Sequence, residues 1–129
     1  MRVEIHFTTE VIIVPPLALP SREIGACAEF HGIVRELEGG AAIAGLHYDA
    51  YESMARTQLA RHFTDLAREH TCDAVTFIHR LGWVPVAESS LYLCVLAAHR
   101  GTALSFLAET IERLKLDVPI WKSSPSPQS

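Results

Sequence analysis

The chain has 129 residues, of which 49% are hydrophobic and 20% charged, and its formal net charge is −4. These values are typical of one soluble domain that folds without disulfides or a metal. The negative charge argues against a non-specific nucleic-acid binder, which needs a basic stripe. The sequence has no signal-peptide core and no apolar run near the roughly 20 residues that a membrane helix needs.

The first half of the chain predicts strands. Residues 2–7 alternate apolar and polar side chains, as a half-buried strand does. Residues 11–14 form a second strand or an extended segment, and the prolines that follow prevent regular structure up to about Ser21. Residues 24–35 and 43–51 flank a Gly-Gly turn, which predicts a hairpin of two strands.

The second half predicts two amphipathic helices and two further strands. The helices cover residues 52–70 and 101–116, and the strands cover residues 74–80 and 89–99. The second of these strands is apolar almost throughout, which favours burial on both faces. The predicted inward-facing residues are Met54, Ala55, Leu59, Phe63, Leu66 and Ala67 in the first helix and Leu104, Leu107, Ile111 and Leu114 in the second.

This order of elements predicts an α+β fold, with antiparallel strands covered by two main helices. Pro119 ends the second helix, and residues 120–122 form a short extended piece. We therefore expect a single domain over residues 1–122, followed by a disordered polar tail over residues 123–129.

Arginine greatly outnumbers lysine among the basic residues of the chain. Nine are arginines, and the only lysines are Lys115 and Lys122, near the C-terminus. A lysine amine can lose its proton and act as a base or a nucleophile, whereas a guanidinium stays protonated. Chemistry at these two positions is one interpretation. The alternatives are a cation that stabilises the end of a helix for Lys115 and a surface lysine for Lys122.

Two arginines follow predicted strands. His99 and Arg100 lie where the most apolar strand meets the second helix, and the N–H groups of a helix start favour an anion. A solvated arginine beside a strand end explains this pair equally well. Arg35 ends another strand after Gly32, and there an exposed hairpin arginine is the simpler interpretation.

The cysteines and remaining histidines indicate no cofactor or metal site. Cys27, Cys72 and Cys94 form no CxxC pair, so we expect reduced thiols in a cytoplasmic protein. None of His31, His47, His79, Cys27 and Cys94 has zinc-ligand spacing, and packing within strands explains all five better. We expect no bound metal.

Several short motifs together resemble the large, catalytic subunit of molybdopterin synthase over residues 24–122. The strongest is HR, followed by LK and then PxWK. The matching residues are Gly25-Ala26, Phe30, Gly32, Val34-Arg35, Tyr48-Asp49-Ala50-Tyr51, Met54-Ala55, Ile78-His79-Arg80-Leu81-Gly82, Ala98-His99-Arg100, Leu114-Lys115 and Pro119-Ile120-Trp121-Lys122.

The resemblance implies an α/β hammerhead fold with a small additional antiparallel sheet. It also implies a sulfurtransferase that needs no cofactor and acts in molybdenum cofactor biosynthesis. Sulfur would pass from the C-terminal Gly-Gly thiocarboxylate of a small ubiquitin-like subunit to cyclic pyranopterin monophosphate, forming the dithiolene of molybdopterin. Such enzymes are homodimers that carry one small subunit at each end, and so are heterotetramers.

The resemblance also implies roles for individual residues. Lys115 and Lys122 correspond to the catalytic lysines. Arg35, His99 and Arg100 correspond to the residues that hold the anionic substrate, and Phe30 corresponds to a pocket wall.

The chain departs from the family pattern in three places. Ser124 replaces a frequent glutamate, the segment after Lys122 is short, and a proline-rich stretch replaces a helix after the first strand. These departures leave open a paralogue that binds the sulfur carrier without turnover. An unrelated Schiff-base enzyme that acts on a small anionic carbonyl compound is a more distant alternative.

Overall fold

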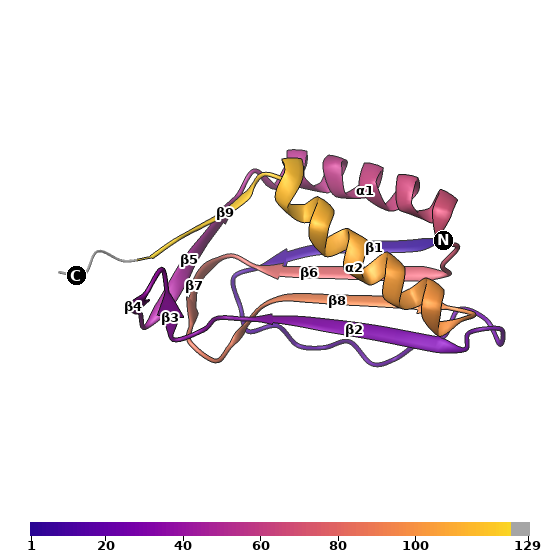
Figure 1. The fold of residues 1–129 in the computed structure, drawn as a ribbon, viewed down its shortest axis with the longest axis horizontal. Coiled ribbons are helices and arrows are strands. Elements are labelled where there is room, and N and C mark those ends of the chain that lie inside the picture. Colours follow the sequence, from indigo (N-terminus) through magenta and orange to yellow (C-terminus); the bar gives the residue numbers. More distant parts are fainter. Residues whose placement is uncertain (125–129) are drawn as a thin grey trace.

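A computed structural model describes residues 1–124, and the predicted tail lies outside the described residues from position 125 onward. Two helices cover one face of a four-stranded sheet, and two smaller sheets extend from one end (Figure 1). The helices are α1 (Glu52–Glu69) and α2 (Arg100–Asp117). The strands are β1 (Arg2–Thr8), β2 (Ala26–Ile33), β3 (Leu37–Glu38), β4 (Ala41–Ala42), β5 (Gly45–Ala50), β6 (Ala74–Arg80), β7 (Gly82–Pro85), β8 (Ser89–Ala97) and β9 (Ile120–Ser123).

The main sheet has the strand order β1-β6-β8-β2. β8 lies inside it, and all of its residues after Ser89 are buried, which confirms the predicted central strand. β8 pairs antiparallel with both neighbours, but β1 runs parallel to β6. The α+β prediction is confirmed, with one parallel pair in an otherwise antiparallel sheet.

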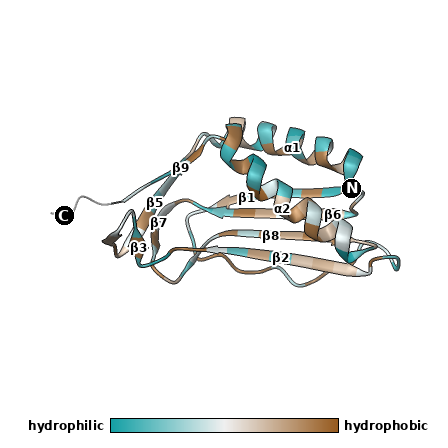
Figure 2. Cartoon of the chain, in the orientation of Figure 1, coloured by the Kyte–Doolittle hydropathy of each residue, from teal (hydrophilic) through white to brown (hydrophobic). Residues whose placement is uncertain are grey.

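The two faces of this sheet are covered differently. The inner face packs against α1 and α2 around the stacked rings of Phe63 and Phe106, whose centroids are 6.0 Å apart. The outer face carries a smaller apolar cluster, which packs against Ile12 and Ile24 from the segment between β1 and β2. That segment has no strand over residues 11–14, so the extended alternative holds. Hydrophilic residues are prominent along α1, whereas apolar residues dominate β8 (Figure 2).

The predicted hairpin of residues 24–35 and 43–51 is wrong. β2 pairs with β8, while β5 lies in a different sheet, between β7 and β9. Gly39 and Gly40 have positive φ and close only the two-residue strands β3 and β4. An eight-residue strand gains more by pairing with the buried β8 than with its neighbour in sequence, because the β8 pairing buries apolar side chains.

The prediction that Met54 and Leu104 face the core is also wrong. Met54 and Leu104 are 55% and 56% exposed. In α2 the buried stripe begins at Ala103 and continues through Phe106, Leu107 and Thr110. Leu104 lies about 100° around the helix from Ala103, and the smaller alanine lets α2 approach the sheet closely. The other predicted residues of α2 are buried or partly buried.

The sheet β7-β5-β9 has a small apolar cluster of its own, in which Leu46 of β5 and Val84 of β7 pack with Val34. β7 was not predicted, because its sequence, GWVP, is short and bounded by glycine and proline. Gly45 fits tightly here, since a Cβ would lie 2.5 Å from the Val84 carbonyl oxygen. Ser123, assigned to the tail by its composition, ends β9. Over residues 1–124, no helix has the length and apolar character needed to cross a membrane.

Candidate functional site

Three of the predicted site residues gather toward the end of the molecule that carries the small sheets. Lys115 lies in the last turn of α2, which ends at Asp117 before the extended Val118 and Pro119. The chain then enters β9, which contains Lys122. Arg35 lies in the short segment between β2 and β3 (Figure 1). Proline thus ends the helix that carries Lys115 and directs the chain into the strand that carries Lys122.

Lys122 has a defined neighbour, because its ammonium nitrogen lies 3.3 Å from Glu38 Oε1. Lys122 pairs with Tyr48 in the β5–β9 register, and Glu38 belongs to the β3–β4 hairpin beside it. Next to Lys122, the Trp121 ring packs edge-on against Tyr51 with centroids 5.2 Å apart. The sequence did not predict Glu38 as a neighbour of Lys122, because the two are 84 positions apart and no local pattern connects them.

His99 and Arg100 lie at the opposite end of α2, and both are exposed. No side chain caps the helix, and its first turn contains no acidic residue. The first N–H groups of α2 and the Arg100 guanidinium can therefore attract an anion. In the described part of the chain, Arg35, Arg100 and Lys115 form no ion pair, so their charges are available to a ligand.

The helix keeps the two groups of basic residues apart. Fifteen residues separate Arg100 from Lys115, which places them about 22 Å apart along the axis. The structure therefore brings Lys115, Lys122 and Arg35 to one end and His99 with Arg100 to the other. One copy of the chain does not assemble all of the predicted residues around one small substrate.

Phe30 lies between these ends on β2. It is partly buried and packs against the core on the inner face of the main sheet. A Cβ on Gly32 would lie 3.5 Å from the Phe30 ring, which is an ordinary van der Waals contact. The role of Phe30 as a pocket wall remains a prediction.

The His79-Arg80 motif joins the main sheet to the small one. His79 is buried, its Nδ1 donates a hydrogen bond to the Arg80 carbonyl oxygen at 2.8 Å, and its ring packs against Tyr48 of β5. The Arg80 guanidinium pairs with Glu88 at 2.8 Å. Burial lowers the pKa of His79 from its ordinary value of 6.5. The contacts of His79 and Arg80 thus connect parts of the fold and indicate a structural role for this motif.

We expect His79 to make the protein less stable in mild acid. Below about pH 6.5 the unfolded chain takes up a proton that the folded protein resists, so the free energy of unfolding falls with pH, by at most about 1.4 kcal/mol per pH unit. Urea unfolding between pH 7.5 and 5 should show a flatter pH dependence for His79→Phe than for wild type. His47→Gln, at a more exposed histidine, is the control. Equal slopes for wild type and His79→Phe would contradict this assignment.

Comparison with known sequences places these residues in a family. The profile described as "MoaE protein" matches residues 7–117. The chain is 41% identical over 99 residues to the molybdopterin synthase catalytic subunit of Drosophila mojavensis, covering 76% of the chain and 27% of that relative. It is 34% identical over 120 residues to the human protein of the same description, covering 92% and 64%. The chain thus spans between about a quarter and two thirds of the length of these relatives.

Solved structures show the same fold. Molybdopterin synthase from Staphylococcus aureus superposes with a TM-score of 0.79 at 29% identity, over 84% of this chain and 80% of that one. A MoaE protein from Burkholderia ambifaria gives 0.79 at 24% identity, over 100% and 86%. The profile match, the human relative and the shared fold agree with the motifs in the sequence, and the chain therefore belongs to the MoaE protein family.

Proposed function

We propose that this protein is the catalytic subunit of a molybdopterin synthase. It transfers sulfur from the C-terminal thiocarboxylate of a small ubiquitin-like subunit to cyclic pyranopterin monophosphate. The observation that carries the proposal is that both lysines and Arg35 lie on elements toward the same end of a chain of this family, the end with the small sheets (Figure 1). An amine there can move a proton or attack the thiocarboxylate carbonyl, and a guanidinium can hold a phosphate.

The separation along α2 supports a site shared between two copies. If Lys115 and Arg100 act on the same substrate molecule, they must come from different chains, because the helix holds them about 22 Å apart. In a symmetric dimer, the lysine end of each chain faces the His99-Arg100 end of its partner, giving two equivalent sites.

Exposed apolar side chains support contacts with other subunits. Ile33, Leu37, Trp83 and Trp121 are between 43% and 61% exposed, and all lie on or beside the small sheets. Exposed large apolar side chains such as these four are suited to contact with another subunit. A Helicobacter pylori complex of subunits 1 and 2 of molybdopterin-converting factor superposes with a TM-score of 0.69, which supports a small partner subunit.

Mixing two inactive variants tests the shared site. Lys115→Ala and Arg100→Ala should each abolish molybdopterin formation from the cyclic monophosphate and a thiocarboxylated carrier. Coexpression should restore about a quarter of wild-type activity, because half of the dimers would contain one intact site. Lys115→Ala coexpressed with Lys115→Ala is the control. Mixed dimers that remain inactive would show that each site lies within one chain.

The binding-only alternative rests on Ser124, where the family often has a glutamate. A titration of the carrier, run beside the activity assay, separates the two functions. Tight carrier binding by a wild-type protein that forms no molybdopterin would favour the paralogue and overturn the proposed activity.

A further inference from the structure

A buried histidine connects the middle of α1 to the last residue of α2. His62 is buried, and its Nε2 donates a hydrogen bond to Asp117 Oδ1 at 2.5 Å. On the other side of the ring, the Arg113 guanidinium lies 3.5 Å from His62 Nδ1 and 3.8 Å from Asp65 of α1. These four side chains form a continuous polar chain between the two helices.

The neighbours of the His62 ring define the role of each ring nitrogen. A carboxylate only accepts hydrogen bonds, and a guanidinium only donates them. One tautomer therefore satisfies both neighbours, with the hydrogen on Nε2 facing Asp117 and the bare Nδ1 facing Arg113. Glutamine can imitate the essential half of this arrangement, because its amide nitrogen also donates.

Asp117 occupies an unfavourable place for a carboxylate. It is the last residue of α2, where the negative end of the helix dipole disfavours an acidic side chain. The residues that follow do not provide a glycine cap, because Val118 is extended and Pro119 has no N–H group to return to the helix. The hydrogen bond from His62 compensates the carboxylate and holds the last turn of α2 against α1.

This contact restricts the direction of Lys115. Lys115 precedes Asp117 by two residues, so its side chain leaves the helix about 200° around the axis from Asp117 and only about 3 Å away along it. Holding Asp117 against α1 therefore keeps Lys115 on the other side of α2, where it is exposed. Just beyond the helix, the Tyr51 N–H donates a hydrogen bond to the Pro119 carbonyl oxygen at 3.1 Å, which holds the chain that leads to Lys122.

We propose that His62 is a positioning residue for sulfur transfer, which acts through Asp117 to hold the Lys115 amine in its productive orientation. This inference rests on the proposed function, in which Lys115 is the reacting lysine. A change in the orientation of a reacting group lowers the rate of the chemical step. Binding of the anionic substrate depends on the arginines instead. Loss of the His62 contact should therefore lower kcat and leave KM for the cyclic monophosphate unchanged.

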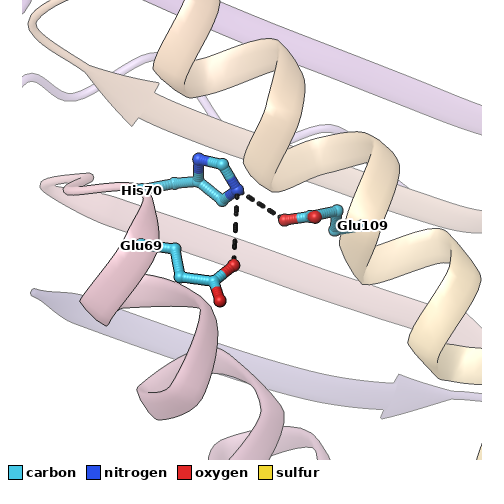
Figure 3. A group of neighbouring side chains, drawn as sticks. All are labelled: Glu69, His70 and Glu109. Atoms are coloured by element: carbon cyan, nitrogen blue, oxygen red, sulfur yellow. Dashed lines mark hydrogen bonds and ion pairs between the residues drawn. The ribbon is translucent and has the colours of Figure 1, made fainter.

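A second contact of the same kind provides a matched control. His70 lies between Glu69 and Glu109 near the end of α1, and its Nε2 donates a hydrogen bond to Glu109 Oε2 at 2.5 Å (Figure 3). A histidine and a carboxylate thus join the same two helices there. Glu109 precedes Lys115 by six residues, which is about 9 Å along the helix axis. Loss of the His70 contact therefore removes a similar interaction but leaves the last turn of α2 held.

Leucine variants of the two histidines test the proposal, with kcat and KM measured for molybdopterin formation. His62→Leu should lower kcat by about 10-fold, because a misplacement of about 1 Å costs up to about 100-fold and the backbone limits the shift. His70→Leu should keep the wild-type kcat. His62→Gln, which can still donate to Asp117, should recover most of the rate. Asp117→Ala removes the same contact at a half-exposed position, so it should fold and lose as much activity as His62→Leu.

Amide hydrogen exchange of residues 114–117 follows the last turn of α2 without substrate or carrier. Exchange should be faster in His62→Leu and as in wild type in His70→Leu. An unchanged kcat in His62→Leu and Asp117→Ala, an equal loss in His70→Leu, or no recovery in His62→Gln would overturn the positioning role. Wild-type protein that forms no molybdopterin would instead refute the proposed function and, with it, any catalytic role of His62. The exchange rates would still show whether His62 holds the helix end.

Discussion

Replacing Lys115 with arginine should stop molybdopterin formation almost as completely as replacing it with alanine. Both changes should lower kcat by about 10²- to 10⁴-fold, the usual contribution of a positioned proton-transfer group. Arginine keeps the positive charge at the end of α2 but cannot give up its proton at neutral pH. The measurement is product formation at saturating substrate and thiocarboxylated carrier.

A remote cation provides the control for this pair of variants. Arg68→Lys changes a cation on α1 whose only ion pair in the described residues is with Asp65 at 3.4 Å. It should leave kcat unchanged. An active Lys115→Arg enzyme would show that Lys115 acts only as a cation that stabilises the helix end.

Phe63→Ala should destabilise the protein by about 3–5 kcal/mol, the usual cost of removing a buried aromatic ring. Phe63 is fully buried and stacks on Phe106, so its loss leaves a cavity between α1 and α2 that rigid neighbours fill poorly. Chemical unfolding with unchanged m-value would measure the loss. Met54→Ala on the same helix should change stability by about 0.5 kcal/mol or less, because Met54 is largely exposed. Similar losses in both variants would contradict this picture of the core.

Helices and the central strand could be predicted from the sequence because their signals are local. The apolar spacing within α1 and the continuous apolar run of β8 are both present within a short window. Met54 and Leu104 were misassigned because apolar character alone does not show which stripe of a helix faces the sheet. In α2 the small Ala103, and not the larger Leu104, lies in the buried stripe, and only the packed structure shows this.

The pairing of strands that are distant in the chain could not be predicted from the sequence. Nothing in the sequence around β1 indicates a parallel partner 72 residues away, and nothing near Lys122 indicates Glu38. The chemically important residues could still be selected, since lysine is rare in this chain and the motifs resemble a known family. The separation of Lys115 from His99 and Arg100 by the length of α2 depends on the fold.

The length of α2 has a consequence for how this family can vary. Inserting one residue in the helix turns everything beyond it by about 100° and moves it by about 1.5 Å. Lys115 would then point elsewhere relative to the His99-Arg100 end. Adding two whole turns restores the direction but displaces the lysine by about 10 Å, farther than a small substrate spans. Exposed positions of α2 other than Arg100 and Lys115 are therefore free to vary in side chain, whereas an insertion or deletion that keeps the two ends in place must fall in the loops.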